Sequence, residues 1–108
     1  MIEKKYQFTI SENKTIEKVV EDDYVAINHI ILTKGDVVPE HFSNSNVYLI
    51  VVRGIATLKF NTQDEHIYHA GSILNVPYKT KMNVSNQHDE VMEFFVFKAP
   101  SPKNFKEE

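Results

Sequence analysis

The sequence lacks cysteine and tryptophan and holds only three glycines among its 108 residues. Without cysteine, disulfides, thiolate metal ligands and cysteine nucleophiles are excluded. No apolar run approaches the roughly 20 residues that a membrane-spanning helix requires, and residues 1–5 do not lead into the apolar run of a signal peptide. We therefore expect a cytoplasmic protein without a membrane partner.

A strong charge of one sign is also missing. Twelve Lys and Arg residues stand against fifteen Asp and Glu residues, for a formal net charge of −3. The basic residues are scattered along the chain and form no stripe, so nucleic acid is not an expected partner. A hydrophobic content of 42% is enough to fill one core.

The length suits one domain over residues 1–108, with a core that spans about residues 24–98. The last ten residues, 99–108, carry two prolines and many charges. We expect this segment to form a surface tail.

Short apolar or alternating segments, separated by turn residues, predict an all-β domain. Residues 15–20 fit either a helical face or a strand, and we favour the strand because everything that follows is strand-like. The run 47–52 is continuously apolar, which predicts a strand buried on both faces. Many short strands without a long helix indicate an antiparallel sandwich or barrel. The expected strands cover residues 6–10, 24–32, 47–52, 55–60, 65–69, 73–76, 82–84 and 91–97.

The three glycines mark positions where the backbone needs a positive φ or a close approach. Their spacing resembles the two sequence motifs of the cupin superfamily. Five residues separate glycine from histidine in the first motif, and five separate glycine from proline in the second. The matching residues are Gly35, His41 and Gly54 in the first motif and Gly71, Pro77 and Asn86 in the second.

This resemblance implies a cupin-type double-stranded β-helix, or jelly-roll barrel, of the kind found in small single-domain bacterial cupins. One departure is Lys79, which stands where the second motif has another glycine. The resemblance also implies a homodimer that pairs through sheet edges. The alternating segment 6–10 would offer such an edge.

The larger departures fall on the metal site. Cupin enzymes hold a transition metal with two histidines and a glutamate from the first motif and a histidine from the second. Here His41 keeps the first position, whereas Ser43, Val47 and Met82 occupy the other three. Valine cannot coordinate a metal, methionine suits soft metals, and catalytic zinc sites keep about three protein ligands. The resemblance therefore implies a degenerate site, with His41 and His29 as weak candidate ligands and no cofactor expected.

Three functional hypotheses remain open, because a fold does not fix a function. The first is a binding module whose barrel pocket, formed by His41, Ser43, Val47 and Met82, holds a small and largely neutral molecule. The second is a metal-dependent enzyme of the dioxygenase or isomerase type, with a non-standard transition-metal site that uses His41. The third is a structural or regulatory partner subunit with an empty barrel.

Overall fold

The computed structural model describes residues 2–105, and within that range it contains nine strands and one short 3-10 helix. The prediction of an all-β fold is confirmed. The elements are β1 (Thr15–Glu21), β2 (Ala26–Leu32), β3 (Val37–Phe42), β4 (Val47–Arg53), β5 (Ile55–Phe60), β6 (His66–His69), β7 (Ile73–Val76), β8 (Lys81–Ser85), β9 (Met92–Lys98) and η1 (Pro102–Asn104).

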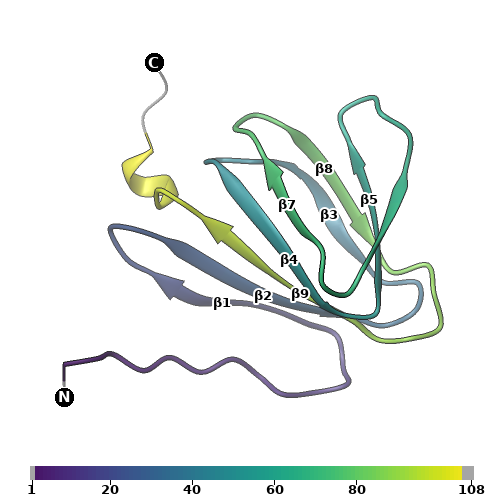
Figure 1. Ribbon diagram of the computed structural model, residues 1–108, viewed down its shortest axis with the longest axis horizontal. Coiled ribbons are helices and arrows are strands. Elements are labelled where there is room, and N and C mark those ends of the chain that lie inside the picture. Colours follow the sequence, from purple (N-terminus) through teal and green to yellow (C-terminus); the bar gives the residue numbers. More distant parts are fainter. Residues whose placement is uncertain (1, 106–108) are drawn as a thin grey trace.

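The strands form two antiparallel sheets, one with the order β1-β2-β9-β4-β7 and one with the order β3-β8-β5-β6. Figure 1 shows them as two layers, the five-stranded sheet beside the four-stranded one. Strands far apart in the sequence lie side by side, since β9 pairs with both β2 and β4. This order of strands is the one expected for a double-stranded β-helix.

The core fills the space between the sheets, and its buried residues come from β2, β4, β5, β7, β8 and β9. Met92, Phe94 and Val96 of β9 are at most 7% exposed, because side chains two apart on a strand share one face. Such side chains contribute about 1.5–3 kcal/mol each when fully buried. The expectation that residues 47–52 are buried on both faces is wrong: Tyr48 and Val52 are 41% and 46% exposed. An antiparallel sheet buries one face and leaves the other accessible.

Two of the motif positions fix corners of the fold. Gly54 has a φ of +74°, and a Cβ atom there would lie 2.3 Å from the carbonyl oxygen of Val91. Asn86 is fully buried, and its side-chain amide donates to the carbonyl oxygens of Leu32 (2.9 Å) and Glu90 (2.8 Å). The motif residues at these corners therefore hold the backbone, which is why their spacing predicts the fold.

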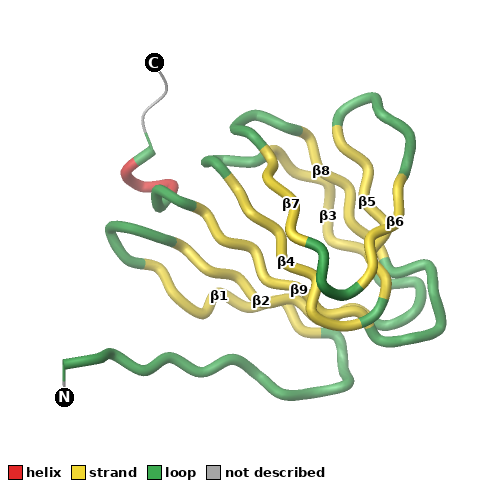
Figure 2. The backbone as a smooth tube through the Cα atoms, in the orientation of Figure 1, coloured by secondary structure: helices red, strands yellow, loops and turns green. Residues whose placement is uncertain are grey.

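The segment 6–10 is not a strand, contrary to the sequence prediction. It runs as an irregular loop beside β1 (Figure 2), and no sheet pairing involves it. The ring of Phe8 instead packs edge-on against His29 and Phe95, with centroid distances of 4.8 and 5.0 Å. This segment therefore does not provide the sheet edge expected for dimer formation. The homodimer stays a prediction that rests on the family resemblance.

The first and third strands illustrate what local patterns can indicate. The ambiguous segment 15–20 is a strand, as favoured, because its pairing with β2 satisfies its backbone groups. The sequence prediction missed β3. This strand contains Pro39 and a register shift between Val38 and His41, so it lacks a clean alternation.

The expected surface tail is partly docked on the body. Ser101 is fully buried, and its backbone N–H donates to the carbonyl oxygen of Tyr24 at 3.1 Å. Phe105 packs edge-on against Tyr78 with a centroid distance of 4.6 Å. Residues 106–108 of the expected tail lie outside the described residues. Within residues 2–105, no helix is long and apolar enough to cross a membrane.

Candidate functional site

A cavity of about 100 Å³ lies between the two sheets, and we call it the barrel cavity. His41 and Met82, two of the predicted pocket residues, both line it and face each other across the β3–β8 pairing. Its wall is mostly apolar, with Asn28, His41 and Lys98 as the polar and charged members. The lining residues are Ile16, Asn28, Ile30, Val38, His41, Leu49, Met82, Val84, Phe94, Val96 and Lys98.

A second cavity of about 110 Å³ adjoins the first, since Asn28 and Lys98 line both. We call it the mouth cavity. Its lining is mostly polar, with three lysines and one glutamate, and it includes the docked segment near the C-terminus. The lining residues are Lys18, Glu21, Ala26, Asn28, Asn44, Lys98, Ser101, Pro102 and Lys103.

Lys98 is the charged group that the two cavities share. It is half-buried on β9, and burial lowers the pKa of its amine, with a smaller contribution from the positive charge of Lys18. Glu21 acts in the opposite direction, because a nearby negative charge favours the protonated amine. Among the residues that the structure describes, no carboxylate lies within ion-pair distance of the Lys98 amine.

Two further polar groups at these cavities have no partner within residues 2–105. The hydroxyl of Ser101 is buried and makes no hydrogen bond, although a buried hydroxyl normally has one. The side-chain amide of Asn28 also makes no hydrogen bond within this part of the chain. Unpaired polar groups around a cavity are what an absent polar ligand or water would satisfy.

Ser43 and Val47 lie apart from the barrel cavity. The Ser43 hydroxyl donates to the carbonyl oxygen of Pro77 at 2.6 Å and accepts from the backbone N–H of Thr80 at 2.8 Å. These bonds tie the chain after β3 to the turn before β8. Val47 is fully buried in the apolar core. Of the four predicted pocket residues, the structure therefore brings only His41 and Met82 to the cavity wall.

Lys79, at the glycine position of the second motif, lies in this same turn. Its φ is +65°, in the left-handed region where glycine is favoured. The backbone conformation that the motif glycine serves is thus retained with a lysine.

His29, the second weak metal candidate, lies on the opposite face of the five-stranded sheet. Its ring is fully buried between two glutamates: Nδ1 lies 2.8 Å from Glu17 Oε2 and Nε2 lies 2.5 Å from Glu93 Oε2. The other oxygen of Glu93 lies 3.2 Å from Nε of Arg53. Each ring nitrogen is thus within hydrogen-bond distance of one carboxylate. Both nitrogens are thus used in this network, on the face away from His41.

The donor set at the cupin metal positions does not fit a transition metal. His41 supplies one imidazole, the Ser43 hydroxyl is engaged with backbone, and no carboxylate is present there. No three His, Asp or Glu side chains converge in the described range 2–105 to hold a metal ion. A degenerate site that carries no metal stays a prediction, which elemental analysis of protein purified without added metal would check.

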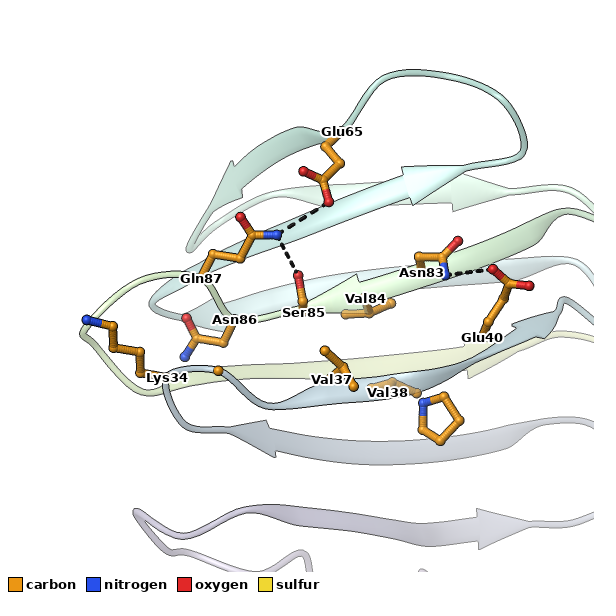
Figure 3. A pocket seen from close by; sticks show the side chains of 12 residues that line it. Lys34, Val37, Val38, Glu40, Glu65, Asn83, Val84, Ser85, Asn86 and Gln87 are labelled. Carbon is orange, nitrogen blue, oxygen red and sulfur yellow. Dashed lines mark hydrogen bonds between the residues drawn. The ribbon is translucent and has the colours of Figure 1, made fainter.

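A larger groove of about 480 Å³ lies on the four-stranded sheet, between β3, β8 and the turns at their ends (Figure 3). Its polar side chains are paired with one another. Asn83 donates to Glu40 at 2.9 Å, and Gln87 donates to Glu65 at 3.3 Å and to Ser85 at 3.2 Å. Because these groups already have partners, the groove lacks the unpaired groups that mark the two cavities.

Sequence reasoning missed Asn28 and Lys98. The sequence does contain a signal for Lys98. Side chains two apart on a strand share a face, so Lys98 lies on the same inward face of β9 as Phe94 and Val96. Asn28 likewise precedes Ile30 on the same face of β2. The sequence predicts both strands, but the polar residues Asn28 and Lys98 on their inward faces were not predicted to line the cavity.

The comparisons with known proteins decide the family. The chain is 45% identical over 104 residues to an uncharacterised protein of Methanocaldococcus jannaschii, a match that covers 95% of this chain and 90% of the relative. A crystal structure from that organism, described as an RmlC-like cupin family protein with a double-stranded β-helix fold, superposes with a TM-score of 0.92 at 45% identity, covering 95% of each chain. The chain belongs to the cupin family. No family model matches it.

More distant cupins share the fold alone. A cupin superfamily protein of Desulfitobacterium hafniense superposes with a TM-score of 0.72 at 16% identity and covers 86% of this chain and 84% of its own. A double-stranded β-helix protein of Klebsiella pneumoniae gives 0.76 at 16% identity, with 89% and 84% covered. The predicted cupin fold is confirmed. The bacterial source stays a prediction, because the relative with 45% identity is archaeal.

Proposed function

We propose that this cupin is a small-molecule-binding protein whose ligand occupies the barrel cavity. The observation that carries the proposal is an apolar cavity with a few convergent polar groups, Asn28, His41 and Lys98. Ligand sites in proteins combine these features: apolar walls for burial and a small number of polar groups that orient the molecule. Met82 adds an unbranched, adaptable side chain to the wall.

The size of the two cavities sets the scale of the ligand. A water-sized group takes up about 30 Å³, so volumes of about 100 and 110 Å³ hold roughly seven such groups. The proposal therefore concerns a small metabolite rather than a nucleotide or a peptide.

A thermal-shift screen of fragments of this size tests the proposal. A ligand at 100 times its dissociation constant stabilises the folded state by about 2.7 kcal/mol, which raises the melting temperature measurably. If no fragment class shifts the melting temperature, the binding proposal is wrong.

Two matched substitutions locate the ligand. Ile16 lines the barrel cavity and is 51% exposed, whereas Val37 lines the outer groove and is 54% exposed. Ile16→Trp narrows the barrel cavity and is expected to abolish the shift, while Val37→Trp is expected to leave it unchanged. The reverse result would assign the ligand to the outer groove.

The binding proposal is preferred over the two alternatives for chemical reasons. A metal-dependent dioxygenase or isomerase needs a donor set that the residues around His41 do not supply. A partner subunit with an empty barrel does not account for the buried, unpaired hydroxyl of Ser101 at the mouth cavity. Such groups cost free energy unless a partner satisfies them.

A further inference from the structure

We propose that the ligand is a small carboxylate whose apolar part fills the barrel cavity and whose carboxylate group lies in the mouth cavity against Lys98. This inference rests on the proposed binding function and names the class of ligand. It departs from the largely neutral ligand that the motif positions alone predict. The reason is that Lys98, on the next inward position of β9, is part of the wall.

The first support is the difference in character between two adjoining spaces. Ile30, Leu49 and Phe94 are among the apolar residues of the barrel cavity. The mouth cavity has three lysines and a single carboxylate, Glu21, in its lining. A molecule that bridges the two spaces would have one apolar end and one anionic end.

The second support is that the three lysines differ in their ion-pair partners and in their burial. Lys103 pairs with Asp23 at 3.0 Å, and Lys18 lies 3.8 Å from Glu21. Lys98 has no such partner within residues 2–105, although it is the most enclosed of the three. Burial and the nearby Lys18 both oppose its positive charge, so an anion placed there would gain from both.

The third support is the buried Ser101 hydroxyl, which lines the mouth cavity and lacks a partner among the described residues. A hydroxyl can donate to one carboxylate oxygen while the Lys98 amine donates to the other. The unpaired side-chain amide of Asn28 offers another donor at the junction of the two cavities. Charge-assisted hydrogen bonds of this kind are about twice as strong as neutral ones.

Short branched acids and their amides form a matched set of probes. Isobutyrate and isovalerate fit the available volume, and isobutyramide and isovaleramide have nearly the same shape without the charge. We expect the acids to bind at least about tenfold more tightly than the amides, since hydrogen bonds to a charged group are stronger than those to a neutral one. Titrations followed by backbone amide NMR shifts measure both series at fixed ionic strength.

Two lysine substitutions complete the experiment. Lys98→Met is expected to remove the preference for the acids. Lys59→Met causes the same change of charge at an exposed position of β5 that lines neither cavity, and it is expected to retain the preference. Ser101→Ala is expected to weaken acid binding several-fold and amide binding less, because the neutral amide oxygen accepts a weaker hydrogen bond from the hydroxyl.

Each other outcome has a definite meaning. If acids and amides bind equally and Ile16→Trp abolishes both, the binding function stands and the carboxylate inference is wrong. If Lys59→Met weakens acid binding as much as Lys98→Met does, the effect is general surface charge, and the inference is also wrong. If neither series binds, the carboxylate inference is wrong, and the fragment screen decides separately whether the proposed binding function stands.

Discussion

The two faces of the five-stranded sheet carry similar polar side chains with opposite surroundings. On the outer face, Glu17 and His29 are cross-strand neighbours on β1 and β2, and both are paired. On the inner face, the adjacent residues Lys18 and Asn28 are also cross-strand neighbours. Lys18 is largely exposed, and the Asn28 amide makes no hydrogen bond in the described part of the chain. Adjacent residues on the same two strands therefore have different surroundings. Glu17 and His29 belong to a network of paired groups, whereas Asn28 lines the barrel cavity.

The difference shows that partners, and not polarity, separate a structural group from a candidate binding group. The outer network around His29 extends further: Glu17 also accepts from the backbone N–H and hydroxyl of Thr9, at 2.8 and 2.9 Å. It ties the N-terminal segment to the sheet. On the inner face, the side-chain amide of Asn28 stays available to a ligand. Substitutions on the outer face and on the inner face should therefore affect the free energy of unfolding differently.

The largest expected effect comes from breaking the outer network at its centre. His29→Ala removes a fully buried ring and leaves Glu17 and Glu93 without their shared partner. We expect the free energy of unfolding to fall by about 3 kcal/mol, since removal of one member of a buried pair typically costs about 3–5 kcal/mol and both carboxylates here keep some solvent access. Urea unfolding measures the change. The control is His66→Ala at an exposed position of β6, expected to change stability by less than about 0.5 kcal/mol.

A smaller effect is expected from loosening the segment that covers this network. Phe8 is 39% exposed, and its ring contacts His29 and Phe95 edge-on. Phe8→Ala should cost about 1–2 kcal/mol from lost apolar burial and ring contact. Ile10→Ala, at a side chain 93% exposed, is the matched control and should have almost no effect. Equal losses in the two variants would mean that the segment is not held by Phe8.

Lowering the pH should reduce the stability that Glu17 contributes through the outer network. The backbone N–H of Thr9, followed by His29, lowers the pKa of Glu17 below its usual value. A carboxyl group with a lowered folded-state pKa contributes stability that is present above its unfolded pKa, about 4.3, and is lost as the pH falls through the folded value. The advantage of the unsubstituted protein over Glu17→Gln should thus be largest above about pH 5 and shrink below it. Urea unfolding across this pH range checks the trend, and an advantage that grows on acidification would contradict it.

The smallest effect on stability is expected on the inner face. Lys98→Met removes a half-buried charge that burial and Lys18 both disfavour. The free energy of unfolding should stay the same or rise by up to about 1 kcal/mol, because replacement of a poorly paired charge by an apolar side chain is often neutral or stabilising. A loss of more than about 1 kcal/mol would show that Lys98 is structural and would remove the contrast between the two faces.

The sequence predicts much of the fold because its signals are local. Gly54 is one such signal, since its positive φ and the nearby Val91 carbonyl leave no room for a side chain. The apolar alternation of residues 91–97 is another, and it corresponds closely to β9 (Met92–Lys98). The alternation of residues 6–10 is equally clear, yet no strand forms, because a strand also needs a neighbour for its backbone hydrogen bonds.

The candidate site depends on the tertiary structure to a greater extent. Motif spacing identified His41 and Met82, which both line the barrel cavity. It also pointed to Ser43, whose hydroxyl is held by Pro77 and Thr80, partners 34 and 37 residues away. Nothing in the local sequence around Ser43 indicates that these bonds form.

The sequence by itself determined most of the strands, the glycine corners and the alternation that directs residues to one face or the other. Only the tertiary structure decided which polar groups have partners. Glu93, which pairs with His29, lies 64 residues further along the chain, and Ser101 is brought to the mouth cavity by the docked segment after β9. The physical reason is that residue type and period are properties of neighbouring positions, whereas hydrogen bonds and ion pairs join positions that only folding brings together.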